Sequence, residues 1–457
     1  MSRRVTRRRF MHGLATVSGA MFVGPYILRA AEVGKDKLRM ANVGTGGRAG
    51  AHLGVGDITV AYCDVDKKRW PKKSARNEAA QGYTDYRQML EKHEKEIDAV
   101  TVGTPDHNHF PASMLAIKMG KHVYCEKPLT WSVAEARALA EATAAKKVAT
   151  QMGNQGHSNE GNRLTVEWIR AGAIGDVKEI HTWTNRPVWP QGIAQRPASK
   201  PVPEGLDWEC WIGPAPYRDY HDGLHDFKWR GWFDFGCGAV GDMGCHTWDC
   251  VFWAMDPDYP STVELMKIEG RNKETFPTKC YFKWTFPAKG TRAAFDAFWY
   301  EGGMKPAVPE EMVNDPYYKD KKNPNKPIGL PGSGTLFIGT KGKLLVQGDY
   351  GDSPRLIPEP AMQAFKRPEK TIPRVTEGHH GNWILACRGE KPWNYPGSNF
   401  ATYAGPLTEV MLLGAISQRI GEEGFKIECD PVARTVKTKE ALQYVTREYR
   451  KGWNFMA

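Results

Sequence analysis

The chain of 457 residues is 41% hydrophobic and 25% charged, which is ordinary for a soluble globular protein and long enough for two domains. Its formal net charge of +11 is concentrated at the N-terminus, where residues 1–30 hold six arginines and no acidic residue, so that the remainder carries about +5. No later basic stretch carries interleaved aromatic residues, and we therefore expect no nucleic-acid partner.

Residues 1–31 have the character of an export signal. The stretch TRRRFM at 6–11 precedes a moderately apolar run that is broken by glycine and proline and ends in small residues. This order predicts a twin-arginine signal, which implies the twin-arginine export machinery as a partner and a periplasmic or otherwise exported location. The apolar run is too short and too interrupted to span a membrane, although a weak cleavage site leaves an uncleaved anchor open. A disordered basic tail is the alternative.

Nine cysteines are scattered between residues 63 and 429 without a C-x-x-C motif, which does not suggest a disulfide framework. Such a chain would fold in the reducing cytoplasm and be exported in the folded state. This route suits a protein whose cofactor is loaded before export, so we expect the cofactor to be tightly bound.

Residues 38–49 predict a dinucleotide-binding turn. A short strand at 38–43 runs into Gly44-Thr45-Gly46-Gly47-Arg48-Ala49, which fits the pattern G-x-G-x-x-A at the start of a helix. The first glycine permits the tight turn, the second lets a pyrophosphate approach the backbone, and the alanine lets helix and strand pack closely. A second strand ends at Asp64, where a carboxylate would accept hydrogen bonds from the adenosine ribose and repel a 2′-phosphate. NAD is therefore favoured, and NADP stays open because Arg48 and the basic run 67–69 could contact a phosphate.

Strand and helix patterns alternate from residue 37 to residue 155. This order predicts an α/β Rossmann domain with a doubly wound parallel sheet and helices on both faces. Ligands of such sheets bind beyond the carboxyl ends of the strands. Thr104-Pro105, Glu126-Lys127 and Asn154 lie at such ends, so we expect these residues to face the cofactor crevice.

Residues 156–457 predict a following α+β domain with a mostly antiparallel sheet, which would serve substrate binding and oligomerisation. Within it, the stretch GCGAVGDMGCHTWD at 236–249 starts a helix with Asp242 and His246 four residues apart on one face. A carboxylate beside an imidazole tunes a histidine for proton transfer near neutral pH. A structural ion pair is the alternative. A metal site with Cys245 is disfavoured because that side chain projects from a different face, and we expect no metal.

The motifs VGTGGRA, CDVD, TPDHNH, CEKP and GDMGCHTWD occur in this order. Together they resemble the glucose–fructose oxidoreductase / inositol dehydrogenase / rhizopine catabolism (Gfo/Idh/MocA) family of NAD(P)-dependent oxidoreductases. The resemblance covers residues 37 to about 290 and the stretch IGTKGKLLV at 338–346. Two features depart from the family: Asp106 stands where asparagine is frequent, and GNQGHS at 153–158 differs from the commoner form.

The resemblance implies roles for individual residues. Lys127, with a pKa lowered by desolvation and by the charge of a nearby nicotinamide, would bind the reacting hydroxyl and assist proton removal. His246 would accept the proton, Asp242 would orient the imidazole, and Asp249 would bind a substrate hydroxyl. The expected cofactor contacts are Gly44, Thr45, Gly46, Gly47, Arg48, Asp64, Thr104, Pro105, His109, Glu126, Lys127 and Asn154.

These features predict an NAD(P)-dependent oxidoreductase that acts on a secondary hydroxyl of a sugar, glycoside or cyclitol. Eight of the sixteen tryptophans lie between residues 183 and 253, where flat rings suit the C–H faces of sugars, although core formation is the commoner use of such a ring. Arg230 is the expected additional substrate contact there. Two alternatives stay open: a redox-neutral glycoside-processing enzyme with captive NAD, and a non-catalytic dinucleotide-binding sensor. The family also implies a homo-oligomer.

Overall fold

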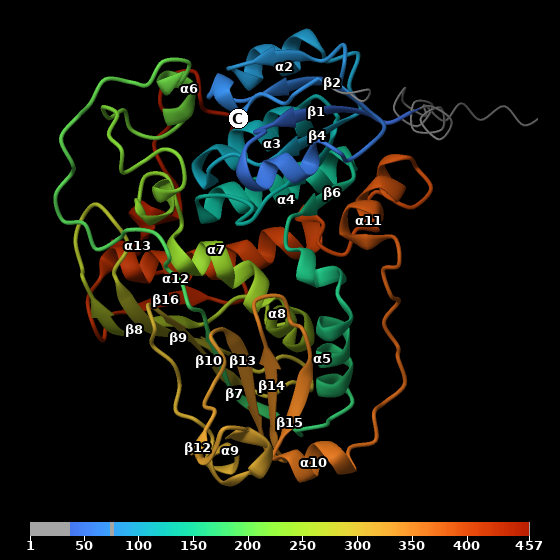
Figure 1. Cartoon of the computed structure of the whole chain (residues 1–457), viewed down its shortest axis with the longest axis vertical. Coiled ribbons are helices and arrows are strands. Elements are labelled where there is room, and N and C mark those ends of the chain that lie inside the picture. Colours follow the sequence, from blue (N-terminus) through green and yellow to red (C-terminus); the bar gives the residue numbers. More distant parts are fainter. Residues whose placement is uncertain (1–36, 74–76, 457) are drawn as a thin grey trace, which may run out of the picture.

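The computed structural model describes residues 37–73 and 77–456, and its first half forms a parallel sheet (Figure 1). The six strands are hydrogen-bonded in the order β3-β2-β1-β4-β5-β6, and every neighbouring pair is parallel. Strands β1 and β4 are almost wholly buried because helices cover both faces of the sheet. The strands are β1 (Arg39–Val43), β2 (Ile58–Cys63), β3 (Gln81–Tyr83), β4 (Ala99–Val102), β5 (His122–Cys125) and β6 (Thr150–Met152). The predicted doubly wound sheet is confirmed.

The helices of this first unit follow the strands in chain order. They are η2 (Gly47–His52), η3 (Lys67–Arg69), α2 (Tyr86–Lys92), η4 (Asp106–Asn108), α3 (His109–Lys118), α4 (Val133–Lys146) and η5 (Gln155–Ser158). The start of α4 shows how sequence sets such a boundary: the Glu135 N–H donates to Ser132 Oγ, and the Ser132 N–H donates to Glu135 Oε2. The helix expected after the glycine turn is the short 3₁₀ helix η2.

The second sheet has nine strands in the order β15-β14-β13-β7-β10-β9-β8-β16-β17, and it is antiparallel except where β7 pairs with β10. Its strands are β7 (Val177–Trp183), β8 (Thr262–Glu269), β9 (Lys279–Phe286), β10 (Phe295–Glu301), β13 (Gly334–Gly339), β14 (Lys343–Gln347), β15 (Pro354–Ile357), β16 (Lys426–Asp430) and β17 (Thr435–Val436). In β9, Cys280, Phe282, Trp284 and Phe286 are buried and alternate with more exposed residues, as expected for a sheet with one covered face. The predicted antiparallel sheet is confirmed.

Helices α7 (Gly238–Thr247) and α12 (Gly405–Ile420) lie between the two sheets (Figure 1). The Trp284 indole of the second sheet donates to Val410 O of α12 at 3.2 Å. The remaining elements of this half are α5 (Glu160–Arg170), α6 (Trp208–Ile212), η6 (Lys228–Gly231), α8 (Asp249–Met255), α9 (Glu310–Asn314), η7 (Pro316–Tyr318), β11 (Lys319–Asp320), β12 (Asn323–Pro327), α10 (Glu359–Ala364), α11 (Gly378–Cys387), η8 (Phe400–Ala404) and α13 (Lys439–Val445).

Parts of the second half pack against the first sheet, so the sequence boundary at residue 155/156 does not separate two independent cores. Trp383 of α11 is buried in one cluster with Leu38 and Met40 of the first unit. Near the C-terminus, Arg447 forms an ion pair of 2.8 Å with the buried Glu135 of α4. In space, the two halves of the chain therefore share their packing.

The export signal expected at residues 1–31 lies outside the described residues. Within residues 37–73 and 77–456, no helix has the length and the apolar character needed to span a bilayer.

Candidate active site

The glycine turn after β1 offers bare backbone to a ligand. Gly44 has a φ of +87°, and a Cβ atom there would lie 2.8 Å from Gly103 O. A Cβ at Gly103 would lie 2.6 Å from Ala49 Cβ, so the turn and the end of β4 need small residues to pack together. Asp64 at the end of β2 fixes the turn, because its carboxylate accepts hydrogen bonds from Thr45 N at 2.9 Å and Thr45 Oγ1 at 3.1 Å.

A cavity of about 380 Å³ opens beyond the carboxyl ends of the strands, where the sequence places the cofactor. Of the predicted residues, those that line it are Gly44, Gly46, Gly47, Arg48, Asp64, Thr104, Pro105, Glu126, Lys127 and Arg230. The other predicted residues do not line it: Thr45, His109, Asn154, Asp242, His246 and Asp249. A glycine turn, a carboxylate after the second strand and a cavity between them fit a dinucleotide.

A segment of the second half, residues 205–230, closes the other side of the cavity, and we call it the covering segment. It supplies Cys210, Trp211, His225, Asp226, Phe227, Trp229 and Arg230 to the cavity wall. Backbone hydrogen bonds attach it to the chain just after β2: Lys67 N donates to Gly205 O at 3.0 Å, and Asp207 N donates to Val65 O at 2.8 Å. The sequence reasoning did not anticipate this cover, because the segment has neither a helical nor a strand-like period.

Lys127, Asp242 and Arg230 form a charged cluster at the inner end of the cavity. The Lys127 ammonium donates to Asp242 Oδ1 at 2.8 Å and to Asp242 O at 2.9 Å, and Arg230 Nε donates to the same Oδ1 at 3.2 Å. Burial alone would raise the pKa of Asp242, but the charges of Lys127 and Arg230 outweigh it and lower that pKa. Burial likewise opposes the charge of Lys127, but Asp242 outweighs it and raises the pKa of the lysine. The lowered lysine pKa implied by the family resemblance would need the added charge of a nicotinamide, because the described residues by themselves raise it.

His246 lies four residues after Asp242 on α7 and is 4% exposed. Burial first, and then the charge of Lys127, lower the pKa of His246 to about 3, so the ring is neutral at pH 7. Its Nδ1 has no hydrogen-bond partner among the described residues, and its ring centre lies 4.8 Å from that of Tyr350. Asp242 bonds to Lys127 and Arg230 in place of the imidazole, because two cations attract the carboxylate more strongly than a neutral ring does. The expected orientation of His246 by Asp242 is thus corrected.

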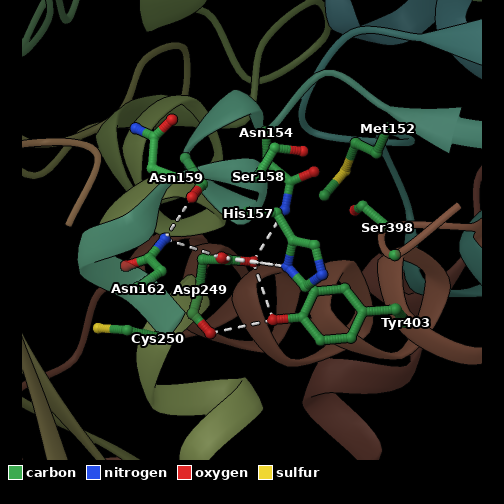
Figure 2. A network of polar contacts seen from close by, with 12 residues as sticks. Met152, Asn154, His157, Ser158, Asn159, Asn162, Asp249, Cys250, Ser398 and Tyr403 are labelled. Carbon is green, nitrogen blue, oxygen red and sulfur yellow. Dashed lines mark hydrogen bonds and ion pairs between the residues drawn. The ribbon is translucent and has the colours of Figure 1, made fainter. Parts of the chain in front are cut away.

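Asp249 is fully buried at the start of α8 and belongs to an interior network (Figure 2). Its Oδ1 accepts hydrogen bonds from Tyr403 OH at 2.8 Å and from Asn154 Nδ2 at 2.9 Å, and lies 3.1 Å from His157 Nδ1. Its Oδ2 accepts from Asn162 Nδ2 at 3.1 Å. A buried carboxylate needs such donors to offset its lost hydration. The structure therefore corrects two expectations, since Asp249 and Asn154 bond to one another inside the protein and not at the cavity wall.

His109 does not line the cavity but contacts two turns that do. Its Nδ1 lies 2.7 Å from Pro128 O and its Nε2 lies 2.8 Å from Thr104 O, so the ring connects the turns that follow β4 and β5. Burial lowers the pKa of this histidine. His109 can thus hold Thr104 and the Lys127-Pro128 turn in place without itself reaching the cavity.

Asp106 lines the cavity and was singled out from the sequence only as a departure from the family pattern. It is 5% exposed, and its Oδ2 accepts a hydrogen bond from Cys237 N at 3.0 Å. Burial raises its pKa to about 7; the charge of Asp242 adds to this rise, whereas the charges of Arg230 and Lys127 oppose it. A carboxyl with a pKa near neutrality adds a further ionisable group to the site.

The fold and the glycine turn define a nucleotide-binding Rossmann protein with a second, mostly antiparallel domain. Residues 38–154 match an oxidoreductase family with an NAD-binding Rossmann fold, and residues 177–287 match the C-terminal alpha/beta domain of that oxidoreductase family. The chain belongs to the Gfo/Idh/MocA family of oxidoreductases.

Individual relatives resemble parts of the chain. The inositol 2-dehydrogenase of Rubrobacter xylanophilus is 28% identical over 156 residues, which are 32% of this chain and 44% of the relative. Glycosyl hydrolase family 109 protein 1 of Akkermansia muciniphila is 29% identical over 175 residues, which are 35% of each chain. The chain thus spans less than half the length of the curated relatives it matches. The WlbA dehydrogenase of Bordetella pertussis, solved with NADH and UDP-GlcNAcA, shares the fold at a TM-score of 0.55 and 18% identity, over 86% of this chain and 99% of that one.

Proposed function

We propose that this protein is an NAD-dependent oxidoreductase that oxidises a secondary hydroxyl of a sugar, glycoside or cyclitol to the ketone. The observation that carries the proposal is the cluster of Lys127, Asp242 and Arg230 at the inner end of a cavity that begins at the glycine turn. The names of the relatives, an inositol dehydrogenase among them, support the substrate class.

Bound NAD would supply the hydride acceptor, held by the glycine turn and Asp64. The residues of the chain would handle the hydroxyl and its proton. Lys127, kept as an ammonium by Asp242, would donate a hydrogen bond to the hydroxyl oxygen and stabilise the negative charge that grows there. The neutral His246 does not line the cavity, so it would accept the proton through one bridging water. Arg230, whose guanidinium lies 4.3 Å from the Trp229 ring centre, would orient a further hydroxyl.

A redox-neutral cycle with captive NAD is the second candidate. The covering segment supports it, because a cofactor enclosed between this segment and the glycine turn would exchange slowly. In that cycle a sugar carbon is oxidised, a glycosidic bond is eliminated and the hydride returns to the product. Such chemistry also suits an exported enzyme, since free NAD is scarce outside the cytoplasm.

The proposal extends to location and assembly. The residues at 1–31 motivate export by the twin-arginine route, which fractionation of cells that express the full chain would test.

The outer face of the second sheet carries the partly buried Tyr281, Phe298 and Ile338, which would suit a second copy of the chain. Native mass spectrometry of the purified protein would report subunit number and any bound NAD or NADP together.

The activity is tested on a panel of sugars, glycosides and cyclitols. Net oxidation produces absorbance at 340 nm with added NAD, whereas the redox-neutral cycle produces product without an absorbance change. Lys127→Ala and His246→Ala should each lower kcat at least about 100-fold. Lys200→Ala should not lower kcat, because this lysine is exposed, pairs with Asp222 and does not line the cavity. Full activity in both site variants would refute the catalytic assignment, and dinucleotide binding without any turnover would indicate a sensor.

A further inference from the structure

The end of the cavity beside Asp64 contains an ion pair that joins the two halves of the chain. Arg69 follows β2, and its Nη2 lies 2.5 Å from Asp226 Oδ2 in the covering segment. Arg69 Nε lies 3.5 Å from Asp66 Oδ2, and His225 Nε2 lies 3.3 Å from the same oxygen. Both partners, Arg69 and Asp226, line the cavity.

Arg69 also lies against the glycine turn. A Cβ atom at Gly46 would collide with the Arg69 side chain, so this side chain covers the second glycine of the turn. Thr45 Oγ1 lies 2.8 Å from Arg69 O and 3.1 Å from Asp64 Oδ2, so this one hydroxyl stands between the two residues. Arg69 and Asp64 therefore flank one turn, at the place where an adenosine ribose lies in this fold.

Four basic residues could contact a 2′-phosphate: Arg48, Lys67, Lys68 and Arg69. Of these, only Arg69 lies beside the expected position of the adenosine ribose. Arg48 lines the cavity but bonds to Glu126 at 3.2 Å, at the end of β5. Lys67 and Lys68 are exposed and stand outside the cavity wall, with Lys67 at 6.0 Å from the Trp70 ring centre. Whether a phosphate is accepted thus depends on whether the Arg69 guanidinium is free.

We propose that Asp226 is a cofactor-selecting residue, which neutralises Arg69 and so makes the site bind NAD in preference to NADP. The inference rests on the proposed dinucleotide-binding function. A 2′-phosphate gains most from a free guanidinium, which it can bind in bidentate fashion. Here it would have to displace Asp226 from Arg69 and then lie near three carboxylates, those of Asp64, Asp66 and Asp226. The ribose hydroxyls of NAD carry no such charge and can bond to Asp64 directly.

The position of Asp226 is fixed by the covering segment and not by local sequence. The backbone bonds at Gly205 and Asp207 hold one end of the segment to the chain after β2, and His225 contacts Asp66 beside it. The selecting carboxylate therefore comes from the second half of the chain, 162 residues after the carboxylate at Asp64. A motif search confined to the Rossmann half would leave it out.

The test measures the dissociation constants of NAD and NADP by calorimetry on the full chain after removal of any bound nucleotide. The wild type should bind NAD at least 100-fold more tightly than NADP. Asp226→Asn should tighten NADP binding about tenfold and change NAD binding less than twofold. The double variant Asp226→Asn and Arg69→Met should bind NADP no more tightly than the wild type does. Asp222→Asn is the matched control, because Asp222 lies in the same segment and pairs with the exposed Lys200.

An unchanged NADP affinity in Asp226→Asn, or a wild type that binds both dinucleotides equally, would overturn the inference while the proposed function stands. Binding of neither dinucleotide to the wild type would overturn both. Because the Asp226 side chain is 56% exposed, the variant should fold, and Asp226→Ser gives a second test with the same expected gain.

Discussion

Asp242 holds two cations together inside the protein, so its replacement by asparagine gives a sharp test of the site. The side chains of Asp242, Lys127 and Arg230 are 12%, 14% and 21% exposed. Asp242→Asn keeps an oxygen that can accept from Lys127 but leaves the ammonium and the guanidinium without an opposing charge. Breaking a buried pair costs about 3–5 kcal/mol, and we expect about 3 kcal/mol because one acceptor remains. For a chain of this size that corresponds to a fall in Tm of roughly 3 °C.

The assay is thermal unfolding of the wild type and the variant as a function of pH. The carboxyl of Asp242 has a lowered pKa in the folded protein, so its contribution is complete above its ordinary pKa of 3.8 and is lost as the pH falls below that value. The difference in Tm should therefore be constant from pH 5 to pH 8 and should shrink as the pH falls below about 3.8. Asp222→Asn, which changes an exposed pair, should show no measurable difference at any of these values.

A double-mutant cycle of Asp242→Asn and Lys127→Met measures the interaction energy between the two side chains, apart from the effect of each single substitution on stability. If Asp242 and Lys127 interact as their distance of 2.8 Å indicates, the double variant loses less stability than the sum of the single variants. A Tm for Asp242→Asn within 1 °C of the wild type, or strictly additive losses, would refute the view that this cluster is a tightly coupled charged site.

Three further variants test other parts of the site. Burial raises the pKa of Asp106 from 3.8 to about 7, so the wild type should lose stability as the pH rises from 3.8 through 7. Asp106→Asn replaces this carboxyl by a neutral group and should not show that loss. Superimposable Tm profiles of wild type and variant from pH 5 to pH 8.5 would contradict this. Tyr403→Phe removes a donor 2.8 Å from Asp249 Oδ1 and should cost about 1–2 kcal/mol in urea unfolding, whereas the exposed Tyr217→Phe should cost nothing measurable. Gly44→Ala places a Cβ atom 2.8 Å from Gly103 O at a φ of +87° and should abolish NAD binding in calorimetry, whereas Gly342→Ala, whose Cβ would meet Ile174 at 3.9 Å, should leave it intact. Retained NAD affinity in a folded Gly44→Ala would show that the dinucleotide does not use this turn.

Local patterns predicted the strands of the first sheet and the residues at their carboxyl ends. Strand ends, glycines and the residue after β2 follow from periods and turn chemistry that act over a few residues, and Gly44, Asp64 and Lys127 were all found in this way. The error at Asp249 has a different origin. Its place one turn beyond His246 is visible in the sequence, but the donors that surround it, Asn162 and Tyr403, come from α5 and from η8.

Residue patterns alone were enough to predict a parallel dinucleotide-binding sheet, a mostly antiparallel second sheet and a lysine just after the fifth strand. These features depend on residues close to one another in the chain, so their physical causes can be read locally. The charge pairs became visible only in the folded chain, where Asp242 pairs with Lys127 and Arg230, and Asp226 pairs with Arg69. Electrostatic pairing depends on distance in space and on burial, and both are set when the covering segment and α7 pack against the first sheet.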